Sequence, residues 1–262
     1  MTMTLIASHR GGAILWPENS LTAFRRTAEL PVDQVEFDVH LSADGEVVVI
    51  HDPYLDRTTE ARGPVEALTL AELRQVRLKG AGGDTVPTLA EVAALFRPTP
   101  LMLRMELKTG ADGSPYPGLL ERFAAVLAQA GMLERTVITS FRLPLAAEAL
   151  ADERFDGRVI WLVSRPCLRD AGLEGAIGAA LASGVPAIGL HSADCNARAV
   201  ATCRRAGLSV GAWAVNGAEV IRHILGLGID VFTTDDPVEA LALRQDQSMG
   251  RPPVTGIRAP VM

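Results

Sequence analysis

Ionisable residues at two-residue spacing are the part of this sequence best suited to chemistry. Glu36 and Asp38 are separated by one residue, and so are Glu106 and Lys108. Side chains two positions apart on a strand point to the same side. Three carboxylates directed to one place repel one another, and burying an unpaired charge is costly. We therefore predict that Glu36, Asp38 and Glu106 bind a divalent cation.

The donor set of this predicted site consists of oxygen atoms only. Such a set suits Mg²⁺, Ca²⁺ or Mn²⁺ and disfavours zinc, which prefers histidine and cysteine. An alternative needs no metal: Glu36 and Glu106 would then form salt bridges with Arg10 and Lys108.

Two histidines stand next to other polar residues, in the segments His9-Arg10 and His51-Asp52. A pair of imidazoles can act as general acid and general base near neutral pH. Together with Arg10, Lys108 and a cation, they describe a site that fits a phosphate ester.

The elements that position these residues alternate between strand and helix patterns, which is typical of βα units around a parallel sheet. The expected strands are Thr4–Ser8, Gln34–Val39, Leu101–Leu107, Thr136–Ser140, Arg158–Leu162, Ala187–Leu190, Ser209–Ala214 and Ile229–Thr233. The expected helices are Ser20–Glu29, Leu89–Leu95, Gly118–Ala130, Leu143–Leu150, Leu173–Ala182, Ala197–Ala206 and Ala218–Leu225. Eight regular repeats favour an α/β fold of the (β/α)8 barrel type, whose active site lies at the C-terminal ends of the strands. His9, Glu106 and Lys108 fall at such ends.

We expect one catalytic domain over residues 1–245, followed by a C-terminal tail over 246–262. A segment at about 47–87 interrupts the repeat with a short strand, Val47–Ile50, and a short helix near Leu70–Val76. It is too long for an ordinary βα loop, so we expect a functional insertion over the catalytic face.

Composition excludes several classes of protein. The 262 residues are 48% hydrophobic and 21% charged, as in a globular chain. A net charge of −6 without a Lys/Arg cluster argues against binding of nucleic acid or of an acidic membrane surface. Three cysteines without paired spacing, and no signal segment, predict a cytoplasmic protein. No feature of the sequence indicates the oligomeric state.

The sequence resembles the glycerophosphodiester phosphodiesterase family over about residues 5–237. The N-terminal quarter carries the most specific matches: His9-Arg10-Gly11, Pro17-Glu18-Asn19-Ser20, Glu36-Phe37-Asp38 and His51-Asp52. Later matches include Glu106, Lys108, Ser140, Phe141, Trp213, Asn216, Thr234, Asp235 and Pro237. Ser20 stands where the family usually has threonine and keeps the hydroxyl that can cap a helix.

The resemblance implies the barrel fold and the metal-dependent hydrolysis of glycerophosphodiesters, small-molecule substrates, to glycerol 3-phosphate and an alcohol. It implies a divalent cation on Glu36, Asp38 and Glu106, and His9 and His51 as the acid/base pair. It also implies that Arg10 and Lys108 contact the phosphate of the substrate. Trp213 and Phe141 would line the substrate pocket. A lysophospholipase D-like lipid phosphodiesterase and a non-catalytic barrel that binds phosphorylated ligands are the alternatives. The preferred alcohol, the cation, the roles of the two histidines and a cyclic phosphate intermediate stay open.

Overall fold

A computed structural model describes residues 3–250, in which nine strands form one sheet. The strands are β1 (Leu5–Ser8), β2 (Gln34–Leu41), β3 (Val47–Val49), β4 (Met102–Leu107), β5 (Thr136–Ser140), β6 (Val159–Leu162), β7 (Ala187–His191), β8 (Ser209–Trp213) and β9 (Val231–Thr234). β1 pairs in parallel with both β9 and β2, so the order β1-β9-β8-β7-β6-β5-β4-β2 closes on itself. The predicted (β/α)8 barrel is confirmed, and each of its eight strands ends within two residues of the predicted bounds.

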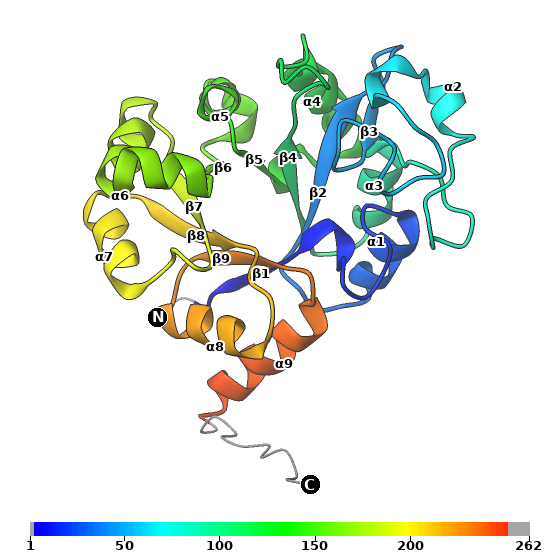
Figure 1. Ribbon diagram of the computed structural model, residues 1–262. Helices are drawn as coiled ribbons and strands as arrows, with labels where there is room; N and C mark the ends of the chain where they lie inside the picture. Colours follow the sequence, from blue (N-terminus) through cyan, green and yellow to red (C-terminus); the bar gives the residue numbers. More distant parts are fainter. Residues whose placement is uncertain (1–2, 251–262) are drawn as a thin grey trace, which may run out of the picture.

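The helices surround the barrel (Figure 1). They are α1 (Leu21–Ala28), α2 (Leu70–Leu73), α3 (Leu89–Phe96), α4 (Leu119–Ala130), α5 (Leu143–Leu150), α6 (Arg165–Ala182), α7 (Ala197–Arg205), α8 (Ala218–Leu227) and α9 (Pro237–Ser248). Capping fixes several starts: Ser20 caps α1, and Thr88 with Glu91 forms a capping box on α3.

Two helices differ from the sequence prediction. α6 begins at Arg165 instead of Leu173, and Gly172, with φ 71°, separates its two parts. α9 was not predicted, and it continues to Ser248, beyond the expected domain end at residue 245. The rest of the expected tail, from residue 251, lies outside the described residues. Within residues 3–250, no helix has both the length and the apolar composition needed to cross a membrane.

Buried apolar side chains pack in two regions, one between the barrel and its helices and one inside the barrel. A large core between barrel and helices includes Phe24, Phe37 and Phe96, which pack edge to face with centroids 5.8 and 6.0 Å apart. A smaller cluster fills the barrel interior with Ala7, Val137, Ile160, Leu162, Ala187 and Val231. Because apolar side chains fill the interior, the inward-facing polar residues lie at the C-terminal ends of the strands, where the active site of such a barrel is found.

The insertion at 47–87 packs on the outside of this scaffold (Figure 1). β3 pairs antiparallel with the end of β2, with Val39 opposite Val49. A separate buried cluster holds the insertion together and includes Ile50, Leu55, Leu73 and Leu78.

Candidate active site

The turn after β1 presents His9 and Arg10 at the C-terminal end of the barrel. Arg10 has a left-handed backbone (φ 50°), and Gly11 follows with φ 80°. A Cβ atom at residue 11 would lie 2.9 Å from Cβ of Ala23 on α1, so this close approach requires glycine. The Arg10 backbone N–H donates to Glu36 Oε2 at 3.1 Å, which holds the turn against the carboxylate on β2.

The three carboxylates predicted to bind metal lie together beside this turn. The register of β2 and β4 sets Asp38 opposite Glu106. One oxygen from each of Glu36, Asp38 and Glu106 lies within 4.8 Å of the others, and all three residues are buried. Burial, together with the charges of Asp38 and Glu106, raises the pKa of Glu36 to about 7. A nearby cation would relieve this repulsion.

Lys108 and Arg10 supply positive charge to the same cluster. Lys108 Nζ lies 2.5 Å from Glu106 Oε1 and 3.0 Å from Asp38 Oδ1, and Arg10 Nε lies 3.4 Å from Asp38 Oδ2. Burial opposes ionisation of Asp38, but Lys108, His51 and Arg10 outweigh it and hold the pKa of Asp38 well below its usual range. Lys108 thus forms with Glu106 the salt bridge that the metal-free alternative requires. Within residues 3–250, the only hydrogen bond that Glu36 accepts comes from the backbone N–H of Arg10.

The cluster retains the capacity for a hard cation. Asp38 Oδ1 is buried and is approached by the Lys108 ammonium at 3.0 Å. Glu36 lies 3.9 Å from His9 Nε2, beyond hydrogen-bonding distance. Carboxylate oxygens from three side chains, within 4.8 Å of one another, fit the oxygen-only coordination of Mg²⁺, Ca²⁺ or Mn²⁺.

His9 is held by a residue from the last strand of the barrel. Asp235, directly after β9, accepts a hydrogen bond from His9 Nδ1 at 2.5 Å. Asn216 Nδ2 donates to the other oxygen of Asp235, also at 2.5 Å. Burial would lower the pKa of His9, but Glu36 and the bond to Asp235 outweigh it, so the pKa is raised. His9 Nε2 stays directed toward the cluster.

His51, like His9, is oriented by a carboxylate. Asp52 accepts a hydrogen bond from His51 Nδ1 at 2.5 Å, and Arg57 Nε donates to Asp52 at 2.6 Å. Arg57 Nη1 also donates to Glu18 at 2.7 Å, which ties the insertion to the turn after β1. Burial, assisted by the positive charges of Lys108 and Arg10, lowers the pKa of His51.

A cavity of about 260 Å³ opens between these groups. His9, Arg10, Glu36, His51 and Glu106 line its polar side, and Phe141, Leu162 and Trp213 line an apolar side. The rings of Phe141 and Trp213 meet edge to face with centroids 5.1 Å apart. The structure therefore brings nearly all of the predicted site residues to one cavity, and the other two, Asp38 and Lys108, contact its lining residues Arg10 and Glu106.

Three further residues support this site, and the sequence prediction gave no role to two of them, Asp235 and Arg104. Asp235 orients His9, and Asn19, with φ 53°, donates from Nδ2 to Asp38 at 2.9 Å. Arg104, which also lines the cavity, precedes Glu106 by two positions on β4. The two-residue spacing could have revealed Arg104, whereas Asp235 is 226 residues from His9.

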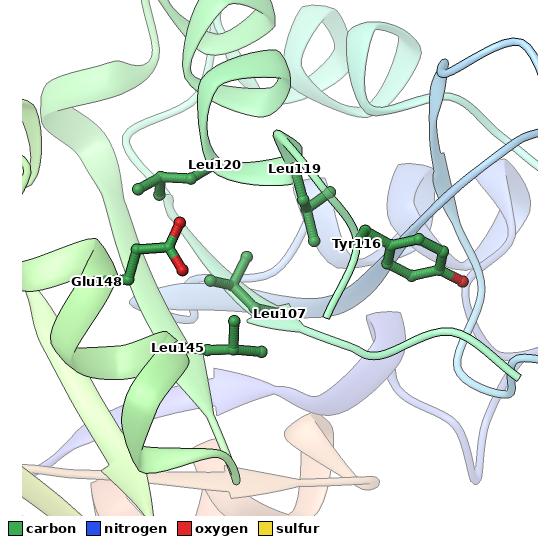
Figure 2. Close-up of a pocket in the computed structure, with 6 residues that line it drawn as sticks. All are labelled: Leu107, Tyr116, Leu119, Leu120, Leu145 and Glu148. Carbon is green, nitrogen blue, oxygen red and sulfur yellow. The ribbon is translucent and has the colours of Figure 1, made fainter. Parts of the chain in front are cut away.

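A second cavity lies between the end of β4 and helices α4 and α5 (Figure 2). It measures about 10 Å³ and is lined mainly by Leu107, Leu119, Leu120 and Leu145. This space suffices for about one water molecule and for no larger ligand.

Comparisons with known proteins agree with the fold. Residues 9–239 match the model of the glycerophosphoryl diester phosphodiesterase family. A glycerophosphodiester phosphodiesterase from Caldanaerobacter subterraneus subsp. tengcongensis is 32% identical over 241 residues, covering 89% of this chain and 95% of the relative.

Solved structures give the same result. A protein from Agrobacterium tumefaciens, provisionally assigned as a glycerophosphoryl diester phosphodiesterase, superposes with a TM-score of 0.90 at 38% identity. The match covers 95% of this chain and 100% of that one. A glycerophosphodiester phosphodiesterase from the same species is 26% identical, with a TM-score of 0.74 and coverage of 92% and 100%.

Proposed function

The chain belongs to the glycerophosphoryl diester phosphodiesterase family and is an enzyme of that kind, and we propose that it hydrolyses glycerophosphodiesters to glycerol 3-phosphate and an alcohol in a metal-dependent reaction. One observation carries this proposal: two carboxylate-supported histidines border one cavity of about 260 Å³, beside a cluster of three buried carboxylates of which Glu36 and Glu106 also line the cavity.

Glu36, Asp38 and Glu106 would hold the divalent cation. When bound, such an ion supplies a Lewis acid that polarises phosphoryl oxygens and offsets their negative charge. Mg²⁺ and Ca²⁺ are the ions we propose, with Mn²⁺ as a further candidate, because the donor set contains only oxygen.

The protein's own cations position and stabilise the phosphate. Arg10, whose guanidinium is held by Glu18 and Asp38, is already oriented before substrate binds. Lys108 is fixed between Asp38 and Glu106. Fixed positive groups beside a phosphate stabilise the charge that develops on its equatorial oxygens in the transition state.

His9 and His51 perform the proton transfers. Each has its Nδ1 bonded to a carboxylate, which leaves Nε2 as the atom that exchanges a proton with substrate. One histidine takes the proton of the attacking hydroxyl, and the other gives a proton to the leaving alkoxide. Water and the glycerol hydroxyl of the substrate are both compatible with this scheme as nucleophile.

The aromatic side of the cavity contacts the organic part of the substrate. Trp213 and Phe141 present ring surfaces there, and Leu162 adds an aliphatic contact. These groups offer packing surface but no charge, which suits a variable alcohol group. We also place the enzyme in the cytoplasm, because Cys167, Cys195 and Cys203 are all free thiols.

The deciding experiment is hydrolysis of glycerophosphocholine before and after exhaustive chelation, with Mg²⁺, Ca²⁺ or Mn²⁺ then restored separately. We expect activity to disappear with the chelator and to return with at least one ion. Full activity after chelation would refute the metal dependence. Lysophosphatidylcholine, run in parallel, separates this activity from that of a lipid phosphodiesterase, and no hydrolysis of either would leave a binding barrel.

A further inference from the structure

Arg104 is a charged residue inside the barrel that the reaction described above does not use. It lies in the middle of β4 and faces inward with Glu106, which is two positions further along the strand. Its side chain is fully buried, with 1% of the residue exposed, yet it lines the catalytic cavity. It therefore contributes to the floor of the cavity, beneath the carboxylates.

This buried guanidinium lacks the partner that its charge requires. Among residues 3–250, no carboxylate lies within 4.0 Å of Arg104, and its Nη1 makes no hydrogen bond. Glu36 and Glu106 attract it only from a greater distance. Buried arginines are usually paired, because a desolvated and unsatisfied cation is costly.

The barrel provides space for this side chain. β4 and β8 are opposite one another in the closed order, with three strands between them on either side. At Gly211 on β8, a Cβ atom would lie 3.8 Å from Arg104 Nη2. The guanidinium thus crosses the barrel interior toward β8, where Trp213 lines the cavity two residues further along.

We propose that Arg104 is an anion-binding residue at the floor of the catalytic cavity and donates hydrogen bonds to a phosphoryl oxygen of the substrate and of the glycerol phosphate product. This assignment rests on the proposed function, which supplies an anion to the cavity. A guanidinium offers donors in a fixed fork that fits two oxygens of one phosphate. An arginine side chain remains charged in proteins at neutral pH.

The test is calorimetric titration of the Mg²⁺-loaded protein with inorganic phosphate and, separately, with sn-glycerol 3-phosphate. Arg104→Met removes the charge and keeps much of the length, whereas Arg104→Lys keeps the charge and loses the fork. Arg165→Met is the matched control, because Arg165 follows β6 at the same end of the barrel and pairs with Asp194 at 3.0 Å, outside the cavity.

We expect Arg104→Met to weaken the binding of both ligands by about tenfold or more, and Arg104→Lys to weaken it less, while Arg165→Met binds like the wild type. Wild-type affinity for phosphate in a folded Arg104→Met protein would overturn the proposal. A loss confined to glycerol 3-phosphate would also overturn it, because Arg104 would then hold a glycerol hydroxyl.

If Arg104→Met does not fold, the titration of Arg104→Lys with phosphate is the test. Unchanged phosphate affinity in that variant would refute the anion-binding role of Arg104. Hydrolysis of glycerophosphocholine by the wild type tests the proposed function independently. A protein that binds phosphate through Arg104 but does not hydrolyse the diester would contradict that function alone.

Discussion

His9 and His51 have the same chemistry but different electrostatic surroundings. Asp235 and Glu36 raise the pKa of His9 against the effect of burial. Burial dominates at His51 and lowers its pKa, although Asp38 and Asp52 act in the other direction. Acid/base pairs in enzymes commonly have environments that shift their pKa values apart. Each imidazole is held on a carboxylate, so both have fixed orientation as well as distinct proton affinity.

We predict that His9→Ala and His51→Ala each lower kcat by about 10²-fold or more, since general acid–base steps contribute about 10²–10⁴-fold. Steady-state hydrolysis of glycerophosphocholine at saturating cation measures the effect, and the melting temperature reports folding. His223→Ala is the matched control, because His223 lies on α8 and outside the cavity. Near-normal turnover in either active-site variant would assign that histidine a structural role only.

The raised pKa of Glu36 predicts a pH-dependent response to the cation. Its pKa is about 7 in the folded protein, above the usual 4.5, so the folded state binds this proton more tightly than the unfolded state. In the absence of cation, Glu36 therefore contributes a loss of stability as pH rises from 4.5 through 7. A cation competes with the proton, so the cation-induced increase in melting temperature should be larger at pH 8 than at pH 5.5.

Two variants distinguish the contribution of Glu36 to the cation-induced increase in melting temperature from that of the other ligands. Glu36→Gln should make the cation-induced shift small and nearly independent of pH. Asp38→Asn should weaken cation binding at both pH values and reduce the pH trend without abolishing it, because the charge of Asp38 is one cause of the raised pKa of Glu36 and burial is another. An equally large shift at both pH values in the wild type would contradict the assignment of Glu36 as a ligand.

Local periodicity could predict much of the candidate site, and barrel closure explains what it could not. Glu36, Asp38 and Glu106 were predictable because the two-residue period of a strand fixes their common face. The role of Asp235 was not, because its contact with His9 exists only when β9 pairs with β1. Arg104 shares the spacing of Glu106, but its lack of a partner is a property of the folded interior.

The start of helix α1 contributes both to the stability of the helix and to the geometry of the site. Ser20 Oγ accepts from Ala23 N at 3.0 Å and donates to Pro17 O at 2.7 Å. The preceding residue, Asn19, contacts Asp38, so the start of α1 also fixes one side of the metal cluster. The hydroxyl expected to cap this helix does so.

We predict that Ser20→Ala lowers the free energy of unfolding by about 1 kcal/mol through loss of the cap. Ser20→Thr keeps the hydroxyl and should stay within about 0.5 kcal/mol of the wild type. Urea unfolding followed by circular dichroism measures both values. Equal stability of the wild type and the alanine variant would show that water replaces the cap.

The repeating pattern predicted all eight barrel strands, since each combines aliphatic residues with a bounding turn. α9 was missed although Asp236, Pro237 and Glu239 provide a cap, a first-turn proline and an acidic first turn. Its buried face is narrow, with Pro237, Ala240 and Leu243, so the apolar period that indicates a helix is weak. At α6, the left-handed Gly172 divides the helix, and only its second half follows the period.

At the scale of the whole molecule, the insertion acts at the edge of the cavity. Of the described residues that line the cavity, His51 alone comes from 47–87. The insertion is fastened to the barrel at several points: Arg57 binds Glu18, and Arg74 Nη1 binds Glu91 at 3.0 Å. We propose that it forms part of one catalytic domain with the barrel and serves mainly to position His51.

Arg57 provides the contact through which this positioning can be tested, because it joins Glu18 on the barrel to Asp52, the support of His51. Arg57→Met should lower kcat about tenfold, as loss of an outer partner commonly does. It also removes the positive charge that holds the pKa of Asp52 near 2. Asp52 then attracts the imidazolium form of His51 more strongly, so the pKa of His51 rises, and the corresponding limb of the pH–rate profile moves to higher pH.

Arg74→Met is the matched control for this prediction, since it removes another ion pair between the insertion and the barrel without touching His51 or its support. If the insertion served only stability, both variants would lower the melting temperature and leave kcat and the pH profile unchanged. If it positions His51, only Arg57→Met shifts the profile. Identical kinetic effects of the two substitutions would contradict positioning through Asp52, because a general loosening of the insertion is the one consequence that both share.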